Sequence, residues 1–362
     1  MGQPHSSSQR QWPHLMVGLM LSLLSFFFTL CAGEMAFRCY QRVRWGIPLR
    51  AEVIRPSPSF PVVLDAQRGW RAVENFHSVT TQKSVDGSTY TRTLSQNEYG
   101  FRMFGEVHTQ RMKVLVIGDS VTHALEASDD KTYYAVMKDA LNVEVFAYGV
   151  IGYGTLQEYL VLDRYLDDIK PDLILWQFCS NDFVNNSVEL EEQSTWENSG
   201  TVRPYLIDGQ IRYVLARKGA TLRQFAQQHS RLLHVIFGRL DTLTTSPQTI
   251  ETHIEQFGMK HEGFLRSLRV TEALMGKVKS RAGKIPIGAF SADEKQPYLE
   301  AFQALSTQHG MHFLGSVRPA LRAAEQGGSV VLAADGNHWN EAGHRVVGET
   351  LAAALRTSGT LR

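Results

Sequence analysis

The chain has 362 residues, of which 43% are hydrophobic and 20% charged, and its formal net charge is +1. This composition is typical of a folded protein with one sizeable domain and attachments, and the near-zero charge gives no basic field that would favour nucleic acid as a partner. The three cysteines are too few and too scattered for a disulfide framework, and the sequence contains neither a Cys-x-x-Cys pair nor a His-Glu-x-x-His pattern. We therefore expect no metal and no cofactor.

The N-terminal segment differs in kind from the rest of the chain. After a short tail at 1–14, residues 15–33 carry no charge and are dense in Leu, Phe and Met, close to the roughly 20 residues that cross a bilayer as a helix. A buried core helix would show a polar stripe, which this stretch lacks. A cleaved signal peptide is the other alternative, but residues 30–33 offer no clean Ala-x-Ala site. We expect an uncleaved, single-pass transmembrane anchor at 15–33.

Arginines flank this apolar stretch unevenly. Arg10 precedes it, and five arginines follow it: Arg38, Arg42, Arg44, Arg50 and Arg55. Read literally, the positive-inside rule would place the C-terminal part of the chain in the cytoplasm. On charge alone, the orientation of the anchor is open.

Residues 34–96 are predicted to form a juxtamembrane connector with a small β-hairpin region. The stretch up to about 60 is basic and then rich in proline, as linkers are. Alternating strands at 79–85 and 88–94 flank Asp86-Gly87, a pair that typically turns a hairpin.

Residues 97–358 are predicted to form one α/β domain, because apolar strands and helical stretches alternate along them. The expected helices lie near 131–141, 155–168, 264–282, 295–309 and 341–356, and the expected strands at 113–117, 143–147, 172–178, 285–290 and 311–314. This spacing favours a parallel sheet with helices on both faces.

A long excursion at 183–262 separates the third expected strand from the fourth. It holds a predicted hairpin at 205–213, turned by Asp208-Gly209, and an amphipathic helix near 220–240. Excursions of this length inside compact domains are often lids or binding loops. Its Trp196, Tyr205 and Tyr213 either line a substrate pocket or pack the hairpin.

The tripeptide Gly118-Asp119-Ser120 follows the apolar run 114–117 directly. A strand that ends in a small residue and a hydroxyl presents the serine at the carboxyl edge of a sheet, where ligands bind in open α/β folds. The same tripeptide also makes ordinary turns. Its meaning therefore depends on the other parts that a serine hydrolase needs.

A base and a carboxylate that suit such a serine lie near the C-terminus. Asp335 and His338 are three residues apart on the loop before the last expected helix, so the carboxylate can fold back onto one imidazole nitrogen while the other faces the serine. Asn340 is expected to cap that helix.

Donors for a developing oxyanion lie at two further strand ends. Residues 148–155 follow the second strand and open a helix, so their backbone N–H groups, including that of Gly152, point outward. Asn181 follows the third strand and offers a side-chain amide. A glycine turn and a helix cap are the ordinary interpretations of these two features.

Together these blocks resemble those of the SGNH hydrolases, also called GDSL esterases/lipases, over roughly 97–356. Residues 97–102 and 149–157 resemble a membrane-anchored bacterial subgroup of that family. The matching blocks are Gly118-Asp119-Ser120, Gly152, Ser180-Asn181-Asp182 and Asp335-x-x-His338. The resemblance implies a doubly wound, flavodoxin-like, five-stranded parallel sheet in a three-layer α/β/α arrangement.

The resemblance also implies the roles of the residues. Ser120 would be the nucleophile and His338 the base, oriented by Asp335. The backbone N–H groups of Ser120 and Gly152, with the Asn181 side chain, would form the oxyanion hole. The sequence departs from the family pattern at Ala147, where asparagine is frequent, and at Cys179, where glycine is usual. Neither change removes a catalytic atom.

These features favour a serine esterase that cleaves carboxylic esters through an acyl-enzyme on Ser120. Its substrate would be an ester, such as an acylated glycan or lipid, and its catalytic domain would lie outside the cytoplasmic membrane, as the resemblance implies. One alternative is acyl transfer to a hydroxyl of an envelope polysaccharide, which needs the same residues. The other alternative is a catalytically silent binding domain on a membrane stalk.

Overall fold

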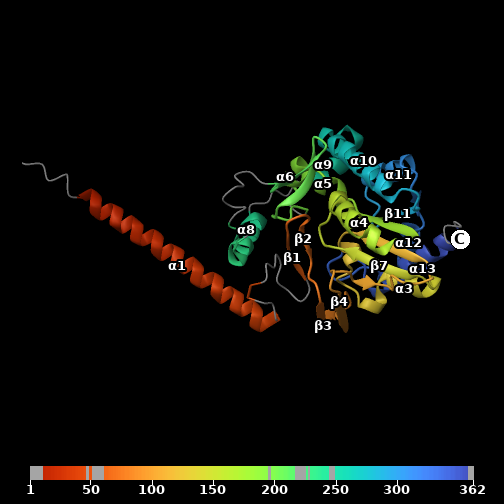
Figure 1. Cartoon of the computed structure of the whole chain (residues 1–362), viewed down its shortest axis with the longest axis horizontal. Helices are drawn as coiled ribbons and strands as arrows, with labels where there is room; N and C mark the ends of the chain where they lie inside the picture. The colour runs from red at the N-terminus through yellow and green to blue at the C-terminus, as the bar shows by residue number, and fades with distance from the viewer. Residues whose placement is uncertain are drawn as a thin grey trace, which may run out of the picture.

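A computed structural model describes residues 11–45, 49–50, 61–194, 197–216, 226, 229–243 and 249–357. Its first element, α1 (Gln11–Trp45), contains the predicted span and continues beyond it. Among the described residues, one helix is long and apolar enough to cross a membrane, and the most apolar stretch of this helix is not buried by the rest of the protein. Figure 1 shows α1 projecting away from the rest of the molecule. This exposure contradicts a core helix.

The centre of the molecule is a six-stranded sheet in the order β12-β11-β8-β6-β7-β5. Five of its strands run parallel and correspond to the five predicted ones, in the flavodoxin-like order. The predicted five-stranded parallel sheet is thus confirmed, and the structure extends it at one edge by β5, which pairs antiparallel with β7. Two residues are too few to show a periodicity, which is why β5 escaped prediction. The strands are β5 (Met103–Phe104), β6 (Lys113–Gly118), β7 (Glu144–Gly149), β8 (Leu173–Phe178), β11 (Ile287–Ser291) and β12 (His312–Phe313).

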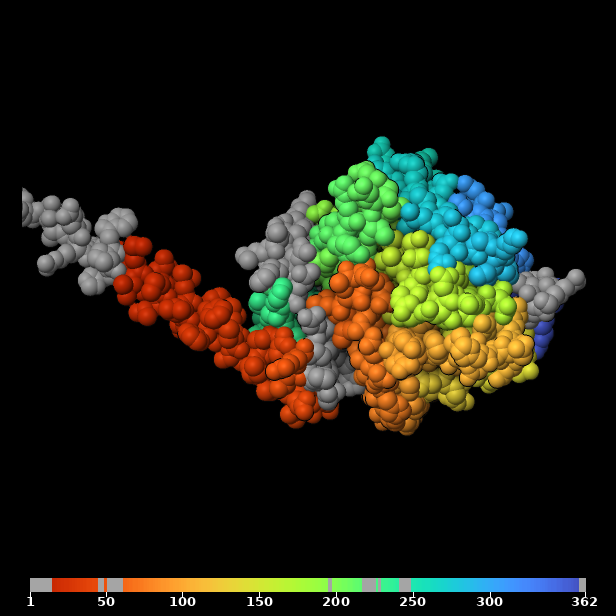
Figure 2. Space-filling view, viewed as in Figure 1, coloured from red at the N-terminus to blue at the C-terminus, as the bar shows by residue number. Residues whose placement is uncertain are grey.

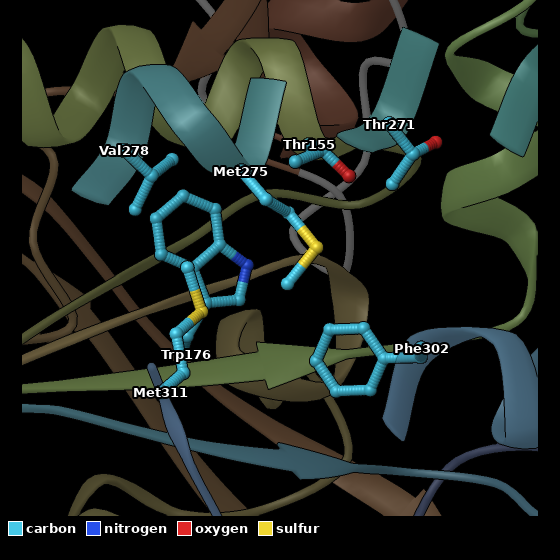
Figure 3. Close-up of a pocket in the computed structure, with 7 residues that line it drawn as sticks. All are labelled: Thr155, Trp176, Thr271, Met275, Val278, Phe302 and Met311. Atoms are coloured by element: carbon cyan, nitrogen blue, oxygen red, sulfur yellow. The ribbon is translucent and has the colours of Figure 1, made fainter. Parts of the chain in front are cut away.

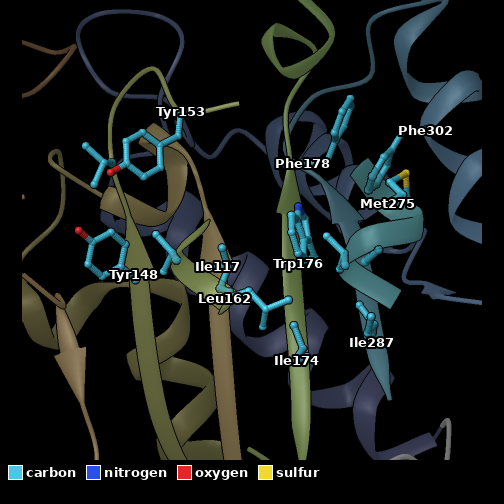
Figure 4. Packing of buried hydrophobic residues seen from close by; sticks show 14 of the residues in the cluster. Ile117, Tyr148, Tyr153, Leu162, Ile174, Trp176, Phe178, Met275, Ile287 and Phe302 are labelled. Atoms are coloured by element: carbon cyan, nitrogen blue, oxygen red, sulfur yellow. The ribbon is translucent and has the colours of Figure 1, made fainter. Parts of the chain in front are cut away.

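Helices cover both faces of this sheet, which explains why its central strands read as continuous apolar runs. Alternate residues of β6 face opposite layers, so Ile117 packs in one hydrophobic cluster and Val116 in the other. Figure 4 shows the first cluster, where Leu162 and Phe302 meet the sheet. The helices of this face are α4 (Thr155–Ile169), α10 (Glu262–Ala282) and α11 (Tyr298–Gln308); those of the other are α3 (Tyr133–Leu141), α12 (Val317–Gln326) and α13 (Glu341–Thr357).

Two β-hairpins precede the sheet. The hairpin around Asp86-Gly87 is present as β3 (Phe76–Lys83) and β4 (Thr89–Gln96), as predicted. A second hairpin, β1 (Val62–Asp65) with β2 (Gly69–Ala72), was not predicted. These four strands lie beside the central domain in Figure 1.

The excursion between β8 and β11 contains the predicted hairpin, here β9 (Arg203–Ile207) and β10 (Gln210–Val214). The second half of the helix predicted near 220–240 is α8 (Arg231–Leu243). Residues 220–225 and 227–228 of that prediction lie outside the described residues, as does Trp196. The described residues also contain shorter elements: α2 (Ser120–His123), η2 (Asp129–Lys131), α5 (Asn181–Asn185), α6 (Val188–Gln193), α9 (Ile250–Phe257) and η3 (Gly258–Lys260).

A small cavity of about 10 Å³ lies inside the first hydrophobic layer (Figure 3). This volume has room for one water molecule at most. The lining is mainly apolar and comes from α4, β8, α10, α11 and the residue before β12: Thr155, Trp176, Thr271, Met275, Val278, Phe302 and Met311. The cavity is therefore a packing void and not a substrate pocket.

Candidate active site

The turn from β6 into α2 presents Ser120 at the carboxyl end of the sheet. Asp119 caps α2 by accepting a hydrogen bond from the N–H of Val121 at 2.9 Å. The turn fits tightly between its neighbours, because a Cβ added to Gly149 would lie 2.6 Å from the Asp119 carbonyl oxygen. Only glycine permits this approach.

Gln177 of β8 also orders the turn and was not singled out from the sequence. Its side-chain oxygen accepts hydrogen bonds from the N–H groups of Asp119, at 3.1 Å, and Thr122, at 3.2 Å. The same oxygen would lie 2.2 Å from a Cβ on Gly118. Gly118 is thus required by the close approach of Gln177.

Hydrogen bonds join Ser120, His338 and Asp335 in one chain. His338 Nε2 lies 2.9 Å from Ser120 Oγ, and His338 Nδ1 lies 2.5 Å from Asp335 Oδ2. The other carboxylate oxygen of Asp335 accepts the N–H groups of Asn337 and His338 at 3.0 and 3.1 Å. Asn340 caps the following helix as predicted, because its side-chain oxygen accepts the N–H of Gly343 at 2.9 Å.

Asp335 and His338, the two titratable residues of this hydrogen-bonded triad, shift each other's pKa. Burial alone would raise the pKa of Asp335, but hydrogen bonds from His338 and from two backbone amides outweigh it and lower that pKa to about 2. Burial would likewise lower the pKa of His338, whereas the Asp335 carboxylate reverses the effect and raises it above its ordinary value. Asp335 is therefore ionised across the working pH range and stabilises the protonated imidazole.

The loop after β7 carries Gly152, which has a φ of +72°. The indole N–H of Trp70 donates to the carbonyl oxygen of Ile151 at 2.9 Å. That carbonyl and the N–H of Gly152 belong to the same peptide plane and point in opposite directions, as in any trans peptide. The hydrogen bond from Trp70 therefore fixes the direction of the Gly152 N–H.

Trp70 lies in β2, outside the predicted hydrolase domain, and is itself firmly held. Its carbonyl oxygen accepts the hydroxyl of Tyr153 at 2.7 Å. The guanidinium of Arg203 lies 4.8 Å from the centre of its indole ring, at cation–π distance. A contact between β2 and the loop of Gly152 could not be read from the sequence, because 81 positions separate Trp70 from Ile151.

His123 holds the other side of the same loop. Its Nδ1 accepts the N–H of Ile151 at 3.3 Å, and burial lowers its pKa well below the ordinary value, so the ring is neutral. The Nε2 of the same ring lies 2.7 Å from the side-chain nitrogen of Gln96. The hairpin β3–β4 thereby supports the loop through Gln96.

Asn181 begins α5 directly after β8, beside the Gly152 loop. Its side-chain nitrogen donates to Asn185 Oδ1 at 3.0 Å and to the carbonyl oxygen of Tyr153 at 3.4 Å. The Asn181 amide therefore lies next to the residue that follows Gly152. The structure thus brings the two predicted oxyanion donors of the second and third strand ends to one rim.

Asp293, which follows β11, clamps the turn that presents Asn181, and the sequence had not indicated it. Its Oδ2 accepts the N–H of Ser180 at 3.0 Å, the hydroxyl of Ser180 at 2.6 Å and the thiol of Cys179 at 3.2 Å. Burial, and then the charge of Asp293, raises the pKa of Cys179 well above its ordinary value. Cys179 is therefore a protonated donor in this turn and not a reactive thiolate.

Buried carboxyl groups lie beneath the rim. Burial, and then the charge of a neighbouring carboxyl, raises the pKa of both Glu158 and Asp182 well above the ordinary value, and burial raises that of Asp119. Glu158 accepts the indole N–H of Trp176 at 2.8 Å, and Asp182 accepts the N–H of Cys179 at 3.1 Å. The raised pKa of each of these carboxyl groups disfavours negative charge beneath the place where an oxyanion would form.

Of the three aromatic residues that the sequence singled out in the excursion, the structure describes Tyr205 and Tyr213. Tyr205 is buried, and its hydroxyl donates to Glu191 at 2.8 Å, whereas Tyr213 is exposed on β10. In the part of the chain that the structure describes, no group of three or more His, Cys, Asp and Glu residues could hold a metal ion.

Comparison with protein families matches residues 114–351 to the GDSL-like Lipase/Acylhydrolase model. A search of curated proteins finds no match. Similar solved structures include TesA, at 14% identity with 68% of this chain and 99% of that chain covered and a TM-score of 0.38. LAE5, an alpha/beta hydrolase enzyme from the metagenome of Lake Arreo, has 16% identity, coverage of 71% and 100%, and a TM-score of 0.38. The psychrotrophic esterase EstA from Pseudoalteromonas sp. has 9% identity, coverage of 68% and 97%, and a TM-score of 0.38.

Proposed function

Since the chain belongs to the GDSL-like lipase/acylhydrolase family and is thus an ester-cleaving hydrolase, we propose that it is a membrane-anchored serine esterase. In this proposal Ser120 forms the acyl-enzyme. The observation that carries it is the continuous hydrogen-bonded chain from Ser120 Oγ through His338 to Asp335. Such a chain is the arrangement by which a hydroxyl becomes a nucleophile at neutral pH.

The first half-reaction acylates Ser120. His338 Nε2 takes the proton of the Ser120 hydroxyl as Oγ forms a bond to the ester carbonyl carbon. The carbonyl electron pair moves to oxygen, and the N–H groups of Ser120 and Gly152 and the amide of Asn181 stabilise the oxyanion. The tetrahedral intermediate collapses, and the alcohol leaves with the proton that His338 returns.

The second half-reaction releases the acyl group. A water molecule gives its proton to His338 and attacks the acyl carbonyl, and the intermediate collapses to free acid and the restored Ser120 hydroxyl. Asp335 holds the imidazole so that Nε2 faces the serine, and its charge stabilises the imidazolium that forms twice in the cycle. The low pKa of Asp335 supports this assignment, because the carboxylate stays ionised throughout.

We assign the remaining parts of the chain by the same proposal. Residues 15–33 anchor the protein in the membrane after the tail at 1–14, and residues 34–96 connect the anchor to a hydrolase domain at 97–358 with a lid-like insertion at 183–262. The exposure and hydropathy of α1 support the anchor. The catalytic domain lies on the outer side of the cytoplasmic membrane in this proposal.

The test is hydrolysis of a short-chain aryl ester by the detergent-solubilised full-length protein, with Ser120→Ala as the variant. We expect the variant to lose activity while keeping its circular dichroism spectrum. Ser88→Ala, in the exposed turn of the β3–β4 hairpin, is the matched control and should keep wild-type activity. Activity of Ser120→Ala at the wild-type level would contradict the proposal. Adding a sugar acceptor and analysing the products separates hydrolysis from acyl transfer with the same residues.

A further inference from the structure

We infer that α8, the amphipathic helix of the insertion, lies in the membrane interface and seats the catalytic domain on the lipid surface where α1 leaves the bilayer. The inference rests on the proposed membrane anchor. In this arrangement the apolar face of α8 contacts the lipid of the bilayer interface, and neither a protein partner nor a second copy of the chain is required.

Glu34 marks the level at which α1 leaves the hydrocarbon. The uncharged stretch that ends at Gly33 has 19 residues, from Leu15, which as a helix span about 28 Å, close to the thickness of a bilayer core. Glu34 is the first charged residue after it, and a carboxylate is costly inside lipid. Glu34 is therefore expected at the boundary between hydrocarbon and water.

The first turn of α8 is hydrogen-bonded to this same residue. The Glu34 carboxylate accepts the hydroxyl of Ser230 at 2.8 Å and the N–H groups of Arg231 and Leu232 at 3.1 and 2.9 Å. These amides are the unsatisfied donors at the start of a helix, and the helix dipole favours a negative charge there. The N-terminus of α8 is thereby held at the depth of Glu34.

Two further contacts with α1 hold α8 beside the end of the span. Leu232 reaches the last residue of the span, since its Cδ2 lies 3.1 Å from the position of a Cβ on Gly33. The guanidinium of Arg231 is buried and donates to Gln41 Oε1 of α1 at 2.9 Å. Figures 1 and 2 show α8 against the C-terminal half of α1, on the side of the catalytic domain.

One face of α8 is apolar and only partly covered by protein. At 100° per residue, five large apolar side chains fall within an arc of about 140°, and they are Leu232, Leu233, Ile236, Phe237 and Leu240. Ile236 is 39% exposed and Leu240 is 49% exposed, whereas Arg231 and His234 lie outside the arc. A helix with such an apolar face along one side is typical of helices that lie in the plane of the interface.

The position of α8 at the membrane boundary favours lipid, rather than a protein, as the partner of its apolar face. The apolar face belongs to a helix whose first turn is fixed to the end of the span, so it lies at the membrane surface whenever α1 is inserted. The same insertion reaches the active-site rim, because Arg203 of β9 donates to Gln157 at 3.1 Å, just after the Gly152 loop. Docking of α8 would therefore set the height and tilt of the active site above the lipid.

The experiment places a fluorophore at single cysteines of the full-length protein in vesicles of phosphatidylcholine and phosphatidylglycerol, with and without brominated acyl chains. In a Cys31→Ser/Cys39→Ser/Cys179→Ser background, which removes all three native cysteines, Ile236→Cys labelled with an environment-sensitive nitrobenzoxadiazole should show a blue-shifted emission and at least twofold quenching by brominated lipid. Ile211→Cys, on β10 of the same insertion and equally exposed at 39%, is the matched control and should not be quenched.

A third label distinguishes failure of the anchor from failure of the inference. The native Cys31 lies inside the span, so its label in a Cys39→Ser/Cys179→Ser protein should be quenched whenever α1 is inserted. Quenching at Cys31 without quenching at Ile236→Cys would overturn the inference and leave the anchor standing. No quenching at Cys31 would overturn both. A blue shift at Ile236→Cys that depends on protein concentration and not on bromine would assign the face to a second copy and overturn the inference.

Discussion

The hydrogen bond from Trp70 to the loop of Gly152 gives the most specific prediction. Trp70→Phe deletes the indole N–H and keeps an aromatic ring against Tyr153 and Arg203. The carbonyl of Ile151 then loses its donor, and the peptide plane that contains the Gly152 N–H loses the bond that fixes its direction. The change therefore acts on one proposed oxyanion donor from a residue that touches no reacting atom.

The structure sets the expected size of this effect. An unpaired buried acceptor costs about 1–3 kcal/mol, and loss of a whole oxyanion donor costs about 10²–10³ in kcat. His123 still holds the adjacent N–H of Ile151 at 3.3 Å, so the loop is loosened and not released. Since about 1.4 kcal/mol corresponds to a tenfold change in rate, we expect kcat to fall by about 10- to 100-fold with KM nearly unchanged.

The assay is steady-state hydrolysis of an aryl ester, with the thermal midpoint measured in parallel. The matched control is Trp176→Phe, because Trp176 is as buried as Trp70, at 3% exposure, and its indole also donates one buried hydrogen bond, to Glu158 at 2.8 Å. Both variants should lose similar stability, but only Trp70→Phe should lose most of its kcat. Equal losses of kcat in the two variants, or an unchanged kcat in Trp70→Phe, would refute the reasoning.

Three further predictions concern the triad and the rim. Asn181→Ala should remain folded and lose about 10²–10³ in kcat, and wild-type turnover of this variant would remove Asn181 from the oxyanion hole. His338 must be neutral to accept a proton, and its pKa is raised, so kcat/KM should rise with pH through a midpoint above the ordinary histidine value of about 6.5. Asp335→Asn should lower the pH of that midpoint and reduce kcat. A midpoint that stays at the same pH in Asp335→Asn would assign this rise in kcat/KM to the titration of another group. Asp293→Asn weakens three hydrogen bonds to the turn before Asn181, so kcat should fall about tenfold at unchanged KM, and a change in KM alone would place Asp293 in substrate binding instead.

The elements that carry the site could be predicted because their signals are local. A strand that ends in Gly118-Asp119-Ser120 and a loop with Asp335 and His338 three residues apart show both their structure and their chemistry in a few residues. Four of the five parallel strands were predictable for the same reason, since β6, β7, β8 and β11 are apolar runs of five or six residues. The fifth, β12, is only His312–Phe313 of the run predicted at 311–314.

The residues that support the site could not be predicted, because their roles depend on contacts distant in sequence. Trp70 meets Ile151, Gln96 meets His123, and Asp293 meets Ser180 across 81, 27 and 113 positions. Each is an ordinary residue in its local pattern, and only the folded chain brings it to the rim. The hairpin β1–β2 was missed for a related reason, as strands of four residues show little alternation.

The central claim is the acyl-enzyme on Ser120, and the most direct measurement is mass spectrometry of the protein quenched in acid during turnover of an aryl ester. The account predicts a mass increase equal to one acyl group on the peptide that contains Ser120, which disappears when the ester is exhausted and is absent in Ser120→Ala. Turnover of the ester by wild-type protein with no acyl group on Ser120 under conditions that trap such intermediates, or with the group on another residue, would contradict it.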